Sequence, residues 1–275
     1  MKNKTTLFTI ILFITSLSVS YGEDIEKFKD KLAALNNVLI ENQVDKNWLF
    51  SNIEDKRFKI YYDLDKFFGA MKEKKVDKQE KSWEWFKNHF GLDLKIKMGQ
   101  KFLKEKANVL QKAEDKNGIP KELVAALLGM ESNFGMESQK GTFYIFNVFV
   151  TQYLLFENRE NIAVEQLTAL YNFEKRADKP TFYFIGSFAG ACGWAQFIPS
   201  SLMNYFVDSN NIDAHIDIYD LEDCIAGVEN YLFNFGLNRE NINVSESLYK
   251  AIYAYNRSDT YVKAILYIYE GLQEL

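Results

Sequence analysis

A single carboxylate, Glu131, ends an apolar helical run and constrains both the fold and the chemistry of this chain. The run extends from Leu123 to Met130, and a turn containing Gly135 follows it. Leu123, Leu127 and Glu131 recur at four-residue spacing, so one helix face carries all three. Burial on such a face disfavours the ionised form, and a protonated glutamate at neutral pH can act as a general acid. The alternative is an exposed residue in the last helical turn, where its charge slightly opposes the helix dipole.

The first residues predict export. Lys2 and Lys4 precede an apolar stretch from Leu7 to Leu17, and small residues follow up to Gly22, as in a cleavable signal peptide over residues 1–22. We therefore expect a periplasmic protein cleaved near Gly22, with an uncleaved anchor as the alternative. A lipid anchor is not expected, because no cysteine stands near the cleavage site. Cleavage removes two lysines and changes the formal charge from −5 to −7, which argues against a nucleic-acid partner.

Composition favours a mainly helical protein. The chain is 47% hydrophobic, has only three prolines and shows few β-branched alternations. The mature chain of about 250 residues is long enough for one large domain, or for a domain with a smaller appendage. Cys192 and Cys224 either form a disulfide, as an exported protein allows, or remain as buried free thiols. Two histidines and two cysteines provide no signature of a structural zinc site.

Hydrophobic spacing predicts where the first helices lie. Apolar residues three or four positions apart predict an amphipathic helix over residues 25–50, and another helix is predicted over residues 98–116. Gly118 is expected to end that second helix, and Pro120 suits the first turn of the helix that leads to Glu131.

The segments between these helices suggest a domain boundary. Residues 58–62 are aromatic and β-branched and are predicted to be extended, whereas the lysine-rich residues 72–81 indicate a solvated loop or face. A soft boundary near residue 100 then divides an N-terminal helical region, residues 23–100, from a core over residues 101–275.

Two further segments carry candidate binding residues. Glycines and other small residues are concentrated in residues 186–201, which allows close backbone approach to a flat ligand, and Gln196 could present its amide to sugar hydroxyls. Tyr255 and Tyr261 flank a predicted helix break at Asn256, where tyrosine rings can stack on sugar faces. A tightly packed helix junction and ordinary core packing are the alternatives for these two segments.

Together these segments resemble the lytic murein transglycosylases, in particular the membrane-bound lytic transglycosylase B family. The family's catalytic helix ends in Glu-Ser or Glu-Thr, followed by two residues of which the second is usually aromatic and then by glycine, as in Glu131–Gly135. Its Gly-Ser-x-Ala-Gly-Ala-x-Gly-x-x-Gln-Phe-x-Pro-Ser element matches Gly186–Ser200, and its Tyr-Asn-x-x-x-x-Tyr-Val element matches Tyr255–Val262. Order and approximate spacing agree over roughly residues 100–275.

This resemblance implies a lysozyme-like helical catalytic core with an N-terminal helical extension. It implies cleavage of the β-1,4 bond between N-acetylmuramic acid and N-acetylglucosamine in peptidoglycan strands, with 1,6-anhydromuramoyl products. Glu131 would be the lone catalytic acid and then the base, and no cofactor would be required. The residues that would line the glycan groove are Ser187, Gln196, Tyr231, Tyr255, Asn256 and Tyr261, with Arg159 a less well matched member.

Two other activities remain open at this point. A hydrolytic muramidase resembling goose-type lysozyme would use water in place of the muramic 6-hydroxyl. A non-catalytic glycan-binding or scaffold protein would keep the groove without the chemistry. The shortage of carboxylates near Glu131 favours the transglycosylase, because Glu137, the nearest downstream acid, lies beyond the Gly135 turn.

One loop resembles the EF-hand-like ion loop that some family members carry. The usual ligand spacing would place the third oxygen at Ile212 and the expected glycine at Ala214, so an inserted residue is needed to bring an acidic side chain into register. A polar turn without a metal is the alternative. If an ion binds, it should be structural Ca²⁺ held by Asp208, Asn210, Asp213, His215 and Asp223.

Overall fold

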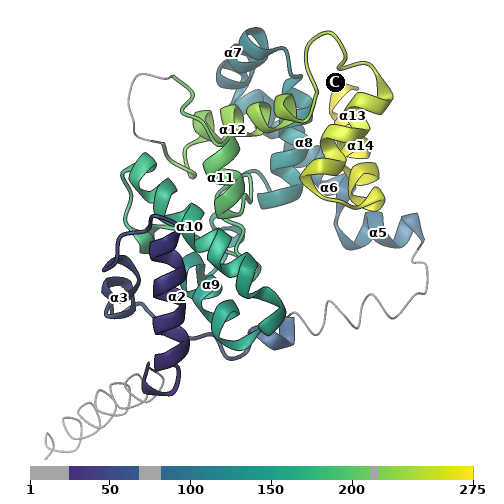
Figure 1. Cartoon of the computed structure of the whole chain (residues 1–275). Helices are drawn as coiled ribbons and strands as arrows, with labels where there is room; N and C mark the ends of the chain where they lie inside the picture. The colour runs from purple at the N-terminus through teal and green to yellow at the C-terminus, as the bar shows by residue number, and fades with distance from the viewer. Residues whose placement is uncertain (1–24, 68–81, 211–215, 275) are drawn as a thin grey trace, which may run out of the picture.

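The computed structural model describes residues 25–67, 82–210 and 216–274, most of which form helices (Figure 1). Two short strands within these residues form one antiparallel sheet. The prediction of a mainly helical protein is confirmed. The predicted signal peptide, the lysine-rich segment and two of the candidate calcium ligands, Asp213 and His215, lie outside the described residues. The elements are α2 (Lys29–Glu41), α3 (Trp48–Ile53), α5 (Trp83–His89), α6 (Leu92–Glu105), α7 (Ala107–Asn117), α8 (Lys121–Ser132), η1 (Glu137–Gln139), β1 (Phe143–Tyr144), α9 (Ile145–Leu155), η2 (Glu157–Arg159), α10 (Glu160–Ala177), η3 (Thr181–Tyr183), β2 (Ile185–Gly186), α11 (Pro199–Tyr205), α12 (Leu221–Asn234), α13 (Ser245–Tyr255) and α14 (Asp259–Gln273).

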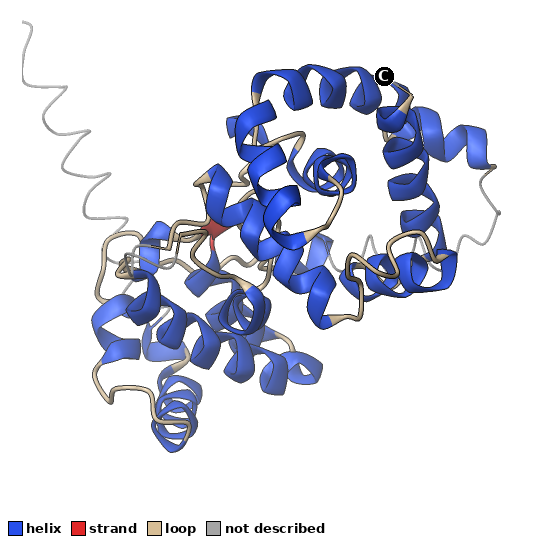
Figure 2. Ribbon diagram, turned by 90° about the horizontal axis from the view of Figure 1, so that it is seen from above, coloured by secondary structure: helices blue, strands red, loops and turns tan. Residues whose placement is uncertain are grey.

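The helices form two groups. In the first group, α10 packs against α2, α9 and α11. In the second group, α6, α8 and α14 pack against one another, and α7, α12 and α13 join them. Figure 2 shows the two groups side by side, with the short sheet at the junction between them. Contacts between α11 and α12 also connect the groups.

The predicted helix over residues 25–50 is wrong in its length. The structure ends α2 at Glu41 and starts α3 at Trp48, because Gln43 adopts a left-handed backbone conformation with φ of 66° and turns the chain. The turn allows the Trp48 indole to donate a hydrogen bond of 2.9 Å to Glu174 on α10. A continuous helix would carry Trp48 away from this partner. Leu32, Leu35 and Leu39 of α2 are buried as their spacing predicted.

The segment after α3 forms neither a helix nor a strand at residues 58–61. Within this segment, Phe58 is buried. The Tyr61 N–H donates to the Thr151 hydroxyl on α9 at 3.0 Å, so a side chain satisfies a backbone donor that a sheet would otherwise satisfy.

The predicted helix over residues 98–116 is also divided in the structure. Its residues belong to α6 and α7, which meet at Lys106, a residue with φ of −112° and ψ of 20°. The two helices share α8 as a neighbour but differ in their other partners: α6 packs on α14, whereas α7 packs on α12. A straight helix could not contact both sets, so tertiary packing overrides local propensity here. Residue 100, the predicted domain boundary, lies inside α6.

Helix α8 lies at the centre of the second group. Gly118 ends α7 in a left-handed conformation with φ of 77°, as predicted, and Pro120 is the residue immediately before α8 instead of part of its first turn. The Pro120 carbonyl accepts hydrogen bonds from the Leu123 and Val124 N–H groups, which starts the helix. Residues 123–129 are all buried between the neighbouring helices.

The two cysteines are buried free thiols in this structure. The Cys192 sulfur lies 3.6 Å from the Phe197 carbonyl, and the Cys224 sulfur lies 3.1 Å from the Ile218 carbonyl. Burial raises the pKa of both thiols above the ordinary value, so both are protonated at neutral pH. None of the described helices combines the length and apolar character needed to span a bilayer.

Candidate active site

Glu131 lies in the last turn of α8, on the face that Leu123 and Leu127 also occupy. Both leucines are fully buried, whereas Glu131 is partly exposed. The hydroxyl of Tyr261 on α14 donates a hydrogen bond of 2.5 Å to Oε1 of Glu131. Tyr261 is 6% exposed, so its hydroxyl is held firmly by the packed core. Two motifs that lie far apart in the sequence therefore meet at one carboxyl group.

The surroundings of Glu131 adjust its proton affinity. Burial raises the pKa of Glu131 to about 7, while the Tyr261 hydrogen bond and the positive charge of Lys95 act in the opposite direction. A carboxyl with this pKa can give up a proton and take one back near neutral pH. Among the described residues, Lys95 is the charged group that acts on Glu131, and Glu137 is instead exposed and paired with Lys140 at 2.6 Å.

The turn after α8 has an unusual backbone. Asn133, Phe134 and Gly135 are consecutive residues with positive φ angles of 47°, 62° and 74°. Such a conformation is rare for residues other than glycine and persists only when the surroundings enforce it. Here a Cβ atom at Gly135 would lie 2.0 Å from the Trp194 ring, and the Phe134 ring leaves no space for a Cβ atom at Gly129. Aromatic packing therefore fixes the turn that presents Glu131.

The glycine-rich segment forms an irregular loop against this turn. Strand β2 pairs with β1 in antiparallel register, with Phe143 opposite Gly186. The Ser187 hydroxyl accepts a hydrogen bond of 3.2 Å from the Ala191 N–H, and the Gln196 side chain donates one of 2.8 Å to the Gly193 carbonyl. Gln196 has a positive φ of 50°. Close backbone approaches therefore require the small residues of this segment, in agreement with the alternative of a tightly packed junction. Ser187 and Gln196 are nevertheless partly exposed.

Two of the predicted sugar-contacting tyrosines use their hydroxyls inside the protein. Tyr255, the last residue of α13, donates to the Ala195 carbonyl at 2.6 Å, and Tyr231 of α12 donates to the Ala254 carbonyl at 2.7 Å. Their ring centroids are 4.9 Å apart. Tyr255 is partly exposed, whereas Tyr231 is 7% exposed. Tyr231 therefore supports the position of Tyr255. Burial raises the pKa of Tyr255, and the negative charge of Glu131 raises it further.

The two remaining predicted contacts differ in position. Asn256 is exposed directly after α13 and precedes the helix that carries Tyr261. Arg159 lies at the end of η2 in the first helix group, where its Nε donates to Gln152 at 2.8 Å. The structure thus brings Tyr255 and Tyr261 to Glu131, while the hydrogen bond of Arg159 ties it to α9.

Sequence reasoning missed Lys95 of α6. Lys95 is 8% exposed, and its Nζ donates to the Gly129 carbonyl at 2.7 Å and to the Asn133 side-chain oxygen. The pattern that could have revealed it is a lysine on the apolar stripe of α6, whose other buried members are Leu92, Gly99, Phe102 and Leu103.

The predicted ion loop begins beside α7 and α12. Asp208 Oδ1 accepts from the Asn210 N–H at 2.9 Å, while Oδ2 is buried and has no hydrogen-bond partner among the described residues. Asp223 accepts from the Ser209 N–H at 3.0 Å and from the Asp217 N–H at 2.9 Å. The described part of the chain contains no cluster of three acidic, histidine or cysteine side chains suited to a metal.

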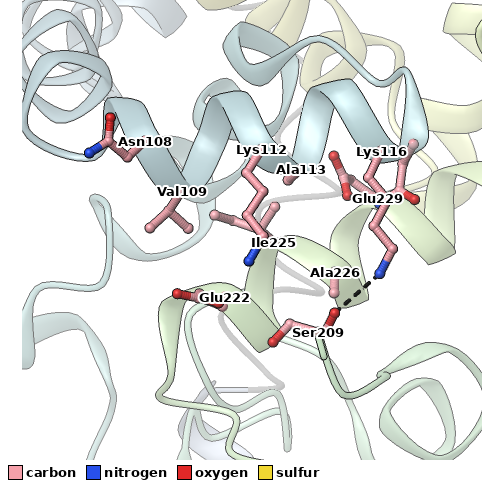
Figure 3. A pocket seen from close by; sticks show the side chains of 11 residues that line it. Asn108, Val109, Lys112, Ala113, Lys116, Ser209, Glu222, Ile225, Ala226 and Glu229 are labelled. Atoms are coloured by element: carbon pink, nitrogen blue, oxygen red, sulfur yellow. Dashed lines mark hydrogen bonds between the residues drawn. The ribbon is translucent and has the colours of Figure 1, made fainter. Parts of the chain in front are cut away.

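A cavity of about 300 Å³ lies between α7 and α12 next to this loop. Figure 3 shows Lys116 donating a hydrogen bond of 3.2 Å to the Ser209 carbonyl at its edge. Glu229 also lines the cavity and is 3% exposed. The lining residues include none of the predicted sugar-contacting residues, so this cavity is separate from the carboxyl site.

Comparison with known proteins places this geometry in context. The chain is 30% identical over 151 residues to the membrane-bound lytic murein transglycosylase B of Escherichia coli (strain K12); the match covers 54% of this chain and 41% of that protein. This chain thus matches about two fifths of the length of that relative. That relative belongs to the family that the sequence motifs resemble.

Solved structures share the fold. The lytic transglycosylase SltB1 from Pseudomonas aeruginosa superposes with a TM-score of 0.74 at 19% identity, covering 90% of this chain and 97% of that one. The Escherichia coli transglycosylase Slt35 in complex with bulgecin A gives a TM-score of 0.72 at 17% identity, covering 89% and 93%. The predicted transglycosylase fold is thereby confirmed. A family model described as the transglycosylase SLT domain matches residues 27–246, so this chain belongs to that family.

Proposed function

We propose that this protein is a lytic transglycosylase that cleaves the β-1,4 bond between N-acetylmuramic acid and N-acetylglucosamine in peptidoglycan. The observation that carries the proposal is the environment of Glu131. Its pKa is about 7, Tyr261 fixes one oxygen, and its charged neighbour is a lysine. Glycosidases that activate water usually employ a second carboxylate, whereas an intramolecular hydroxyl nucleophile does not require one.

The chemistry follows from one carboxyl group used twice. Tyr261 donates to Oε1, so the transferable proton is assigned to Oε2. Glu131 gives this proton to the glycosidic oxygen as the bond to C1 of the muramic residue breaks. The acetamido group of the substrate stabilises the positive charge that develops at C1. The Glu131 carboxylate then accepts the proton of the muramic 6-hydroxyl while the oxygen of that hydroxyl forms the bond to C1. This step yields the 1,6-anhydro end and returns Glu131 to the acid form.

The residues around Glu131 provide the substrate contacts in this proposal. Ser187 and Gln196 offer a hydroxyl and an amide from the loop packed on the α8 turn, and Tyr255 offers an aromatic ring. Asn256 is exposed at the edge of this site. Tyr231 and Arg159 remain members of the proposed groove, Tyr231 through its support of Tyr255. Structures of SltB3 from Pseudomonas aeruginosa in complex with NAG-anhNAM-pentapeptide and NAG-NAM-pentapeptide support glycan fragments as ligands of this fold.

A digest of purified peptidoglycan sacculi tests the activity. Mass spectrometry of the released muropeptides should show mainly anhydro ends, which are one water lighter than hydrolytic products. Dominant reducing muramic ends would establish the hydrolytic muramidase instead. Release of no product by the folded protein would favour the non-catalytic glycan-binding alternative. The Glu131→Gln variant is the matched control for contaminating activity.

The Asp208 loop is proposed to hold structural Ca²⁺. The Oδ2 atom of Asp208 is buried near Asp223 and has no hydrogen-bond partner within the described part of the chain. It fits a hard cation, since calcium prefers carboxylate oxygens. Asp208, Asn210 and Asp223 would hold the ion together with Asp213 and His215. Slt35 has been solved in complex with calcium, which supports the ion type.

A melting experiment tests this calcium site. Binding only to the folded state raises the melting temperature, so millimolar calcium should increase it relative to a chelator. An Asp208→Asn variant should lose the response. Equal midpoints in calcium and chelator for the unaltered protein would identify the loop as a metal-free polar turn.

Export to the periplasm belongs to the same proposal, because the substrate lies outside the cytoplasm. N-terminal sequencing of the mature protein should find a start near residue 23. A cellular protein that begins at Met1 would contradict cleavage of the predicted signal peptide.

A further inference from the structure

Lys95 occupies a position that lysine rarely takes. It lies on the buried stripe of α6, and only 8% of it is exposed. Burial of a charged amine is unfavourable unless partners compensate. Two partners are present at the end of α8: the Gly129 carbonyl at 2.7 Å and the side-chain oxygen of Asn133.

These two partners bracket Glu131 in the sequence. Gly129 precedes it by two residues, and Asn133 ends α8 with left-handed angles of 47° and 50°. A single ammonium group therefore holds the last helical turn and the start of the strained turn that follows. The location also suits a cation, because helix C-termini carry partial negative charge.

We infer that Lys95 is a positioning residue for Glu131, whose ammonium group fixes the end of α8 and favours the carboxylate form that the second half of the reaction requires. This inference rests on the proposed function. Lys95 acts through Glu131 and Asn133 and is not assigned any contact with substrate.

The electrostatic role follows from the groups that face Glu131. Tyr261 from α14 donates a hydrogen bond to Glu131, and Lys95 from α6 provides a positive charge. Tyr255 from α13 has a pKa raised first by burial and then by the negative charge of Glu131. The two tyrosines are neutral at working pH, because their pKa values are well above the ordinary value. The Tyr261 hydrogen bond and Lys95 both favour the carboxylate form of Glu131, and among these three groups Lys95 does so with a positive charge. Without it, Glu131 would still donate its proton but would regain its charged form less readily.

The test compares Lys95→Met and Lys95→Arg with Lys97→Met, a control at an exposed position of the same helix. The first readout is the pH dependence of kcat/KM for muropeptide release. Activity of a general acid falls as pH rises through its pKa. Removal of the positive charge should raise the pKa of Glu131. The midpoint of the activity decrease on the high-pH side should therefore move to higher pH by about one unit, within the range that opposite charges produce. Lys95→Arg should restore the midpoint, and Lys97→Met should leave it unchanged.

A second readout does not depend on turnover. Nuclear magnetic resonance of carboxyl-labelled glutamate, with the Glu131 signal assigned by its loss in Glu131→Gln, should show the same upward shift in folded Lys95→Met. An unchanged Glu131 titration in that folded variant would overturn the inference. Should the wild-type protein release no product, the proposed function fails while this titration still decides the role of Lys95.

A third measurement uses the wild-type protein and covers the case in which Lys95→Met does not fold. The side-chain resonance of Lys95, assigned with Lys95→Arg, should shift with pH at the midpoint of Glu131 titration. A Lys95 resonance that does not respond to this titration would also overturn the inference.

Discussion

Glu131 and Glu174 lie in different helix groups and share one property. Burial raises the pKa of each carboxyl to about 7. Glu174, on α10 in the first group, is 8% exposed and accepts a hydrogen bond from the Trp48 indole. Glu131 is partly exposed, precedes a strained turn and has a lysine as charged neighbour. A raised pKa alone therefore does not identify a catalytic acid.

The difference lies in what each carboxyl can reach. Glu174 connects α10 to α3 and lies within packed side chains. In its protonated form it keeps this structural contact without the desolvation cost of a buried charge. Glu131 has the same proton affinity but is partly exposed, so a substrate can reach it. Its charged neighbour, Lys95, also supports its ionised form. Glu229 on α12 resembles Glu174, because its pKa is also about 7 and Asn117 donates to it at 2.5 Å.

The largest expected effect is on activity. Glu131→Gln keeps the shape of the side chain but cannot deliver a proton, so kcat should fall by about 100- to 10,000-fold. Glu174→Gln should retain activity within a few fold, since its carboxyl is used for packing. Muropeptide release measured for both purified variants checks the contrast. Near-wild-type turnover of Glu131→Gln would show that another residue is the acid.

The sequence predicts the position of Glu131 but does not indicate the role of Glu174. The spacing of Leu123, Leu127 and Glu131 correctly placed the glutamate on a buried face, because helix periodicity is a local property. The resemblance implied only that Tyr261 lines the same groove, and its hydrogen bond to Glu131 could not follow from spacing, since 130 residues separate the two. Glu174 carries no motif, so sequence reasoning did not single it out.

Other features depend on tertiary contacts that no local pattern encodes. The break at Lys106 allows α6 to pack on α14 while α7 packs on α12. Lys95 interrupts an apolar stripe, yet its partners at the end of α8 are fixed only by the packing of α6 on α8. The hydroxyl of Tyr231 donates a hydrogen bond to the Ala254 carbonyl, and the abundance of tyrosine in the sequence could not indicate this partner.

The second prediction concerns stability against pH. The pKa of Glu174 is 4.5 in the unperturbed state and about 7 in the folded protein, so the folded state holds this proton more tightly. The resulting stabilisation is complete below pH 4.5 and is lost as pH rises through 7, a change of about 3 kcal/mol for this group. Glu229 has the same shift and sign. Urea unfolding should therefore give a lower free energy of unfolding at pH 8 than at pH 5.

Variants assign this slope to its residues. Glu174→Gln should remove its share of the pH dependence, and Glu165→Gln, at an exposed position of the same helix, should not. An identical slope in Glu174→Gln and the unaltered protein would mean that Glu174 is not protonated in the folded state.

The smallest expected effect concerns the partner of Glu174. Trp48 packs edge-on against Phe146 and Tyr171, with ring centroids 5.3 and 5.5 Å apart, so Trp48→Phe keeps an aromatic ring at this position and removes the indole donor. Loss of one hydrogen bond should cost about 1 kcal/mol of unfolding free energy at pH 5. The cost should be greater at pH 8, because the indole favours the ionised carboxyl and its loss raises the pKa of Glu174 further. Activity should not change, since Glu131 and its neighbours are untouched. Urea unfolding at both pH values measures the difference, and an equal cost at pH 5 and pH 8 would mean that Trp48 does not act on the charge of Glu174.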